Sequence, residues 1–190
     1  RVDHALHQGN INRAMEEQNE LDEVIEWLAN NINIKETLII VAADHGHSMT
    51  FNGYCGRGTN ILGYCMEIDD KGIENTGKPL VGLDGKPYEV VVFANGPGSV
   101  FKQSKINLVQ NRNKKNFAKH LSWAGARRVD TYGDKFFENH LHRQEALVPM
   151  RKETHSGEDV AVYAVGPWSH LLSGTLEQNF IFHVMNHAIK

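Results

Sequence analysis

The stretch "LIIVAADHGHSM", residues 38–49, constrains the fold more than any other part of the chain. It begins as a continuous apolar run rather than an alternating one, which is typical of a strand in a parallel sheet covered on both faces. Because α/β sheets bind ligands beyond the carboxyl ends of their strands, Asp44 and His45 at the end of this run suggest a metal or catalytic site. An N-capping aspartate followed by an ordinary histidine is the competing interpretation of the same residues.

Composition narrows the classes of protein to which the chain can belong. Its 190 residues are 41% hydrophobic and 23% charged, which is typical of a soluble globular protein with a sizeable core. The net charge of -3 gives no general attraction to nucleic acid, so no nucleic-acid partner is expected. No apolar run approaches the roughly 18 residues of a membrane span, so no transmembrane segment is predicted. Eleven histidines are many for this length, and neutral imidazole is the commonest metal ligand.

The two ends of the chain predict an α/β core. Apolar spacings of three and four over residues 8–31 predict an amphipathic helix, and the strand at Thr37–Ala43 follows it. Near the other end, Asp159–Val165 alternates as a strand does, and "LEQNFIFHVMNHAIK" predicts a closing amphipathic helix. From about Thr50 to Lys152, glycines and turn signals separate short β-prone runs, so this region is predicted to be an excursion from the core.

Two features of the excursion leave alternatives open. Cys55 and Cys65 could form a disulfide in an oxidising compartment or remain two free thiols in a reducing one. The basic segment Phe101–Lys119 could bind phosphate, but its scarcity of aromatic residues favours the solvated face of a loop.

Three further residues are candidate metal ligands. Asp3 and His7 are four residues apart, so a helix would present both side chains on one face, one turn apart. His155 lies in the polar segment "ETHSGED" just before the second predicted strand. Each signal is weak by itself. Together with Asp44 and His45, these residues offer the nitrogen and oxygen ligands that zinc accepts.

Several motifs resemble those of one known family. "RVDHALHQGN" is similar to the R-I-D-H-x-x-H-x-G segment of alkaline phosphatases, and "VAADHGHSMTFNGY" is similar to their strand end followed by F-x-G-Y. The blocks "RGTNILG", "KPYEVVVFANGPG" and "ETHSGEDVAVYAVGPWSHLLSGTLEQNFIFHVM" follow in the family's order. The resemblance is strongest to the animal-type branch.

The resemblance implies a fold and an order of regions. The fold would be the C-terminal part of an α/β sandwich with a central, mostly parallel sheet and an inserted crown-like region. Residues 1–49 would form a core segment with zinc ligands, residues 50–152 the crown-like insertion, and residues 153–190 the C-terminal core segment. The crown region of the family helps to form a homodimer. The segment from Phe101 to Leu141 is longer than expected for an animal-type crown.

The resemblance also implies roles for individual residues. Asp3, His7 and His155 match the ligands of one zinc ion, and Asp44 and His45 match two ligands of a second. His47 matches a histidine that hydrogen-bonds a zinc-binding carboxylate, and Tyr54 matches a tyrosine that in some members reaches toward the partner subunit's active site.

The implied activity is hydrolysis of phosphate monoesters by an extracellular or periplasmic enzyme with two zinc ions and a magnesium ion. The nucleophilic serine, the phosphate-binding arginine and the magnesium ligands of the family are expected upstream of Arg1, so the chain is expected to act with the N-terminal half of the same protein. Two alternatives are a phosphodiesterase or sulfatase-like enzyme of the same superfamily, and a non-catalytic metal-binding or oligomerisation fragment.

Overall fold

The computed structural model describes residues 1–99 and 136–190, and these form two compact units. Unit 1 comprises Arg1–Met15 and Ser48–Thr154, and unit 2 comprises Glu16–His47 and His155–Lys190. The first fifteen residues are therefore grouped with the region expected to be the insertion. The basic segment Phe101–Lys119 lies outside the described residues. No helix among the described residues is long and apolar enough to cross a membrane.

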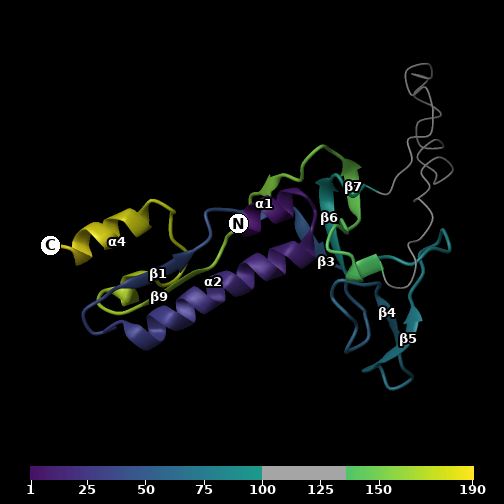
Figure 1. Ribbon diagram of the computed structural model, residues 1–190, viewed down its shortest axis with the longest axis horizontal. Coiled ribbons are helices and arrows are strands. Elements are labelled where there is room, and N and C mark those ends of the chain that lie inside the picture. Colours follow the sequence, from purple (N-terminus) through teal and green to yellow (C-terminus); the bar gives the residue numbers. More distant parts are fainter. Residues whose placement is uncertain (100–135) are drawn as a thin grey trace, which may run out of the picture. The chain divides into compact units, whose positions relative to one another are not determined.

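Unit 1 contains a three-stranded sheet (Figure 1). Its strands are β3 (Met49–Phe51), β6 (Val91–Gly96) and β7 (Ala146–Pro149). Strand β6 is central, antiparallel to β3 and parallel to β7. A separate hairpin pairs β4 (Met66–Ile68) with β5 (Asn75–Pro79), and a 3-10 turn, η1, spans Phe136–Glu138.

The core of unit 1 joins this sheet to the start of the chain. Ile11 packs with Val91, Phe93 and Ala146 in one buried cluster, to which Leu6 and Met49 add partly buried side chains. A disulfide links Cys55 to Cys65, which decides between the two alternatives that the sequence left open.

Two helices, rather than one, occupy the start of the chain. Helix α1 spans Val2–His7 and α2 spans Ile11–Asn31, so the helix predicted for residues 8–31 begins three residues later than expected. The break lies at Gly9, whose φ of +67° is left-handed and suits glycine. The side chain of Asn10 then accepts a hydrogen bond from the backbone nitrogen of Arg13 and caps α2. From Glu16 onward, α2 belongs to unit 2.

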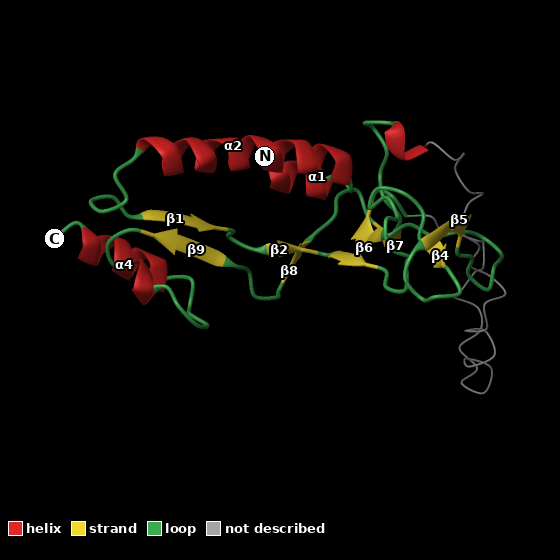
Figure 2. Ribbon diagram, turned by 90° about the horizontal axis from the view of Figure 1, so that it is seen from below, coloured by secondary structure: helices red, strands yellow, loops and turns green. Residues whose placement is uncertain are grey.

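Unit 2 is built from two short antiparallel strand pairs. Strand β1 (Ile39–Ala42) pairs with β9 (Val162–Val165), as Figure 2 shows, and β2 (Gly46–His47) pairs with β8 (His155–Ser156). A 3-10 turn, η2 (Ser169–Leu171), precedes the closing helix α4 (Phe180–Ala188), which confirms the predicted C-terminal helix.

The strand pattern differs from the sequence-based expectation at β1. A buried strand with parallel neighbours was predicted, but the described partner of β1 is antiparallel and its residues are half-buried or exposed. Continuous apolar character predicts burial on two faces, and it does not specify the direction of the neighbouring strand. The described residues thus form a mixed α/β structure with small sheets.

Candidate metal centre

Helix α1 brings two of the predicted metal ligands together in unit 1. Asp3 and His7 are one turn apart, and Oδ1 of Asp3 lies 3.4 Å from Nε2 of His7. This confirms the expectation that a helix would present both side chains on one face.

A backbone carbonyl fixes the orientation of the His7 ring. Nδ1 of His7 lies 2.6 Å from the carbonyl oxygen of Glu153. Because a carbonyl can only accept, Nδ1 carries the proton, and Nε2 of the neutral ring keeps its lone pair on the side of Asp3. Metal-binding histidines are commonly oriented in this way by a hydrogen bond from the other ring nitrogen.

Glu153 was not anticipated from the sequence. It is only 1% exposed, its carboxylate lies 3.7 Å from Nδ1 of His7, and it accepts a hydrogen bond from the backbone nitrogen of Ser48. A glutamate in the polar run "RKETHSGED" gives no sign of burial. The one available signal was its position two residues before His155.

In unit 2, Asp44 and His45 repeat the pairing seen between Asp3 and His7. Oδ2 of Asp44 lies 3.4 Å from Nε2 of His45, while Nδ1 of His45 lies 3.2 Å from the carbonyl oxygen of Gly46. The backbone oxygen of Asp44 accepts a hydrogen bond from Gln178, which ties the motif to the segment before α4. The lone pair of His45 Nε2 therefore faces a carboxylate oxygen.

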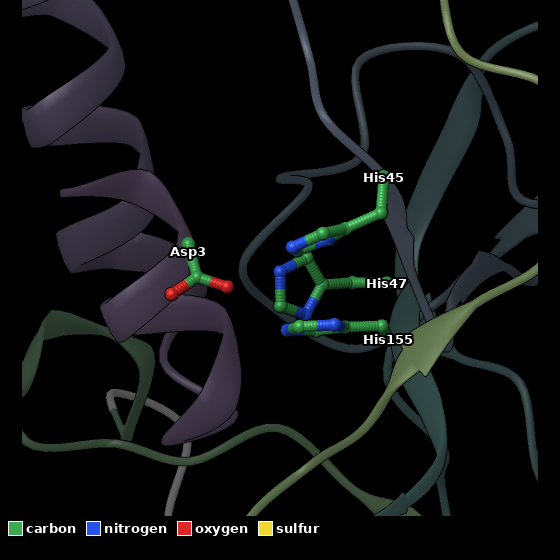
Figure 3. A group of neighbouring side chains, drawn as sticks. All are labelled: Asp3, His45, His47 and His155. Atoms are coloured by element: carbon green, nitrogen blue, oxygen red, sulfur yellow. The ribbon is translucent and has the colours of Figure 1, made fainter. Parts of the chain in front are cut away.

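The β2–β8 pair gathers three imidazoles. His47 and His155 are directly opposite each other across the two strands. The rings of His45 and His155 stack with centroids 3.4 Å apart, and the ring of His47 meets both edge-on at 5.4 and 5.3 Å (Figure 3). One nitrogen of each ring lies within 4.8 Å of a nitrogen of the other two. The three rings thus bring several potential nitrogen donors close together.

Gly46 in β2 lies close to two polar side chains. A Cβ at this position would lie 2.6 Å from Oε1 of Glu158 and 2.7 Å from the hydroxyl oxygen of Ser156. All of these atoms belong to side chains, so a Cβ here would require those side chains to move aside.

The donor atoms fit zinc. Two ligands on a tetrahedral zinc with bonds of about 2.0 to 2.1 Å are roughly 3.3 to 3.4 Å apart. Both carboxylate–imidazole contacts, at 3.4 Å, match this spacing, and both combine the nitrogen and oxygen donors that zinc accepts.

The predicted ligands are therefore divided between the units. Asp3 and His7 lie in unit 1, whereas Asp44, His45, His47 and His155 lie in unit 2. Within each unit the structure brings the predicted residues together. His47, expected to support a ligand, is 8% exposed and has its ring among those of His45 and His155.

Comparison of the sequence with known proteins identifies its family. The sequence model named "Alkaline phosphatase" matches residues 1–190. The chain belongs to the alkaline phosphatase family. It is 36% identical over 188 residues to the tissue-nonspecific isozyme of alkaline phosphatase from Rattus norvegicus and 34% identical to that of Homo sapiens. It is 37% identical over 191 residues to alkaline phosphatase 4 of Drosophila melanogaster.

These matches cover 99% of the chain but 28–29% of the relatives, so the chain spans less than a third of their length. The resemblance to the animal-type branch is confirmed by these relatives.

Proposed function

We propose that the protein containing these residues is an alkaline phosphatase that hydrolyses phosphate monoesters through a two-zinc site and a phosphoserine intermediate. The observation that carries the proposal is the convergence of three imidazoles, with two carboxylate–imidazole pairs, in a member of this family. Zinc held here would act as a Lewis acid and stabilise negative charge on the attacking and leaving oxygens.

The residues of this chain would hold the metal ions. Asp3, His7 and His155 are the proposed ligands of one zinc, and Asp44 and His45 are proposed ligands of the other. The carbonyl of Glu153 holds His7 so that Nε2 is available, and the carbonyl of Gly46 does the same for His45. His47 supports the site from its buried position in β2.

The remaining catalytic groups are proposed to come from the N-terminal half of the same protein. These are the nucleophilic serine, the phosphate-binding arginine and the magnesium ligands. The central, mostly parallel sheet of the family is likewise proposed for the full-length protein, where it would extend the β1–β9 pair.

We further propose that the protein is an extracellular or periplasmic homodimer with residues 50–152 as its crown region. The Cys55–Cys65 disulfide supports an oxidising compartment. Tyr54, the proposed neighbour of the partner's active site, is 89% exposed and adopts a left-handed φ of 64°. An exposed aromatic side chain on a backbone conformation uncommon for tyrosine is consistent with a role in contacting another chain.

The test compares His155→Ala with His183→Ala in the full-length protein. His183 is an exposed histidine of α4 with no proposed ligand role, so it controls for loss of an imidazole. We expect His155→Ala to lose zinc and to reduce hydrolysis of 4-nitrophenyl phosphate by more than about 100-fold, since loss of an outer-shell partner alone typically costs 10–100-fold. His183→Ala should retain both properties.

Metal analysis and a diester assay complete the test. Equal loss of zinc in both variants would show that the ligands are assigned to the wrong histidines. A strong preference for bis-4-nitrophenyl phosphate over the monoester would instead support the phosphodiesterase alternative.

A further inference from the structure

Unit 1 carries a basic pocket of about 370 Å³ in which His7 is the one proposed zinc ligand among the described lining residues. Three arginines, one lysine and two histidines contribute to its lining, and no described lining residue is acidic. They are His4, His7, Arg13, Arg143, Arg151 and Lys152.

The first basic group is fixed at the junction of α1 and α2. Arg13 lies in the first turn of α2, next to the cap formed by Asn10. Arg143 precedes the buried Gln144, whose backbone nitrogen donates to the carbonyl of Gly9 at 2.8 Å. The side-chain oxygen of Gln144 accepts a hydrogen bond from the backbone nitrogen of Ile11 at 2.9 Å. These bonds hold the backbone of Arg143 beside the start of α2.

The second basic group is fixed at the end of α1. Arg151 and Lys152 follow β7 and precede the buried Glu153. The backbone nitrogen of Glu153 donates a hydrogen bond to the carbonyl of His7 at 2.9 Å. The carbonyl of Glu153 in turn accepts a hydrogen bond from Nδ1 of His7. The backbone segments that carry the exposed side chains of Arg143, Arg151 and Lys152 are thus held in place by hydrogen bonds.

The lining suits a phosphate group. Guanidinium groups bind phosphate oxygens through two parallel hydrogen bonds and stay protonated across the alkaline range. His7 is both a lining residue and a proposed zinc ligand, so the pocket adjoins the place where the reacting phosphate would bind.

We propose that this pocket binds a second phosphate group of the substrate, so that bisphosphorylated small molecules are preferred over monophosphorylated ones. The proposal rests on the function proposed above and adds a substrate class to it. The reacting phosphate would bind at the metal centre, and the second phosphate would bind Arg143 and Arg151.

Steady-state kinetics on the full-length protein test the preference. Fructose 1,6-bisphosphate and fructose 6-phosphate form a matched pair that differs by one phosphate. We expect Arg143→Gln and Arg151→Gln each to raise the KM ratio of bisphosphate to monophosphate by roughly tenfold. Arg57→Gln, which removes an exposed arginine outside the pocket, should leave the ratio unchanged.

Calorimetry on EDTA-treated protein tests binding without turnover. The arginines need no metal, so fructose 1,6-bisphosphate should still bind, more weakly at high salt and roughly tenfold more weakly to either pocket variant. Circular dichroism would confirm that the variants are folded. If wild type, both pocket variants and Arg57→Gln bound fructose 1,6-bisphosphate with equal affinity, the proposal that the pocket binds phosphate would be overturned. If the full-length protein did not hydrolyse monoesters but still bound fructose 1,6-bisphosphate through these arginines, only the proposed function would be contradicted.

Discussion

The two units differ in how much apolar surface they bury. In unit 1, Val91, Phe93 and Ala146 are at most 3% exposed and pack around Ile11. In unit 2, the buried apolar side chains among the described residues are Leu172 and Val184.

Large apolar side chains of unit 2 lie exposed instead. Trp27, Tyr163 and Phe182 are each between 59% and 69% exposed. Burial of apolar surface stabilises a fold by about 25 cal/mol per Å². Because these side chains stay exposed, the described residues of unit 2 gain little stability from burying them.

This difference bears on the proposed function, because unit 2 carries four of the six histidine and aspartate residues proposed for the metal centre. Unit 1 can support its features, including the basic pocket, by its own packing. The histidine cluster lies at the short β2–β8 pair, and its geometry would depend more on bound metal and on strands from the rest of the protein.

The largest expected effect follows from separating the 190 residues from the rest of the protein. We expect the isolated fragment to bind at most about one zinc ion tightly and to show no turnover of phosphate monoesters, because the serine nucleophile is proposed to lie in the N-terminal half of the protein. Metal analysis and a 4-nitrophenyl phosphate assay check both points.

Hydrogen exchange on the same fragment would sharpen the comparison. Amides of β6 should exchange slowly and those of β1 and β9 rapidly, whereas all three should be protected in the full-length protein. If the amides of β1 and β6 were equally protected from exchange in the isolated fragment, the two units would not differ in local stability. Robust turnover by the pure fragment would place the nucleophile within these residues.

Sequence reasoning succeeded where the signal was local. The spacing of Asp3 and His7, the position of Asp44 at a strand end and the closing helix were all read from neighbouring residues. It failed where pairing across the chain decides the outcome. The antiparallel partner of β1, the position of His47 opposite His155 and the burial of Glu153 depend on contacts between residues about 100 or more positions apart, which periodicity does not encode.

A second, smaller effect concerns the disulfide of unit 1. Replacing Cys55 and Cys65 together by serine removes a cross-link between residues 10 positions apart in the sequence. The free energy of unfolding should fall by about 2 to 3 kcal/mol. The change should appear in amides of unit 1, including β4 and β6, and leave β1 and β9 unaffected. Denaturant unfolding with and without reductant provides the measurement, and a matched Ser48→Ala variant controls for an unrelated change in the same unit.

An equal loss of protection in both units would contradict the independence of their stabilities. No change in the wild-type protein on reduction would show that the loop contributes nothing to unit 1.

The smallest expected effect is a pH dependence that belongs to unit 1 alone. Glu89 is fully buried, with Oε1 2.6 Å from Nε2 of His142 and Oε2 accepting a hydrogen bond from the backbone nitrogen of Glu145. Burial raises the pKa of Glu89 above its ordinary value of 4.5, and the contacts with His142 and Glu145 offset part of that rise. The folded protein therefore holds the proton on Glu89 more tightly than the unfolded chain does.

The sign of the effect follows from this difference in proton binding. Below the unfolded pKa, both states carry the proton and the favourable contribution of protonated Glu89 is complete. As the pH rises from about 4.5 through the folded pKa, the folded state binds more protons than the unfolded state, so the free energy of unfolding falls. Glu89→Gln replaces the carboxyl group by an amide of the same shape that cannot titrate. The free energy of unfolding of this variant relative to wild type should therefore increase as the pH rises from about 4.5 through the folded pKa of Glu89. Glu67→Gln, a partly exposed control, should follow the wild-type profile. Unfolding measured from pH 4 to pH 8 tests the prediction, and parallel profiles for wild type and Glu89→Gln would show that Glu89 does not couple proton binding to the stability of unit 1.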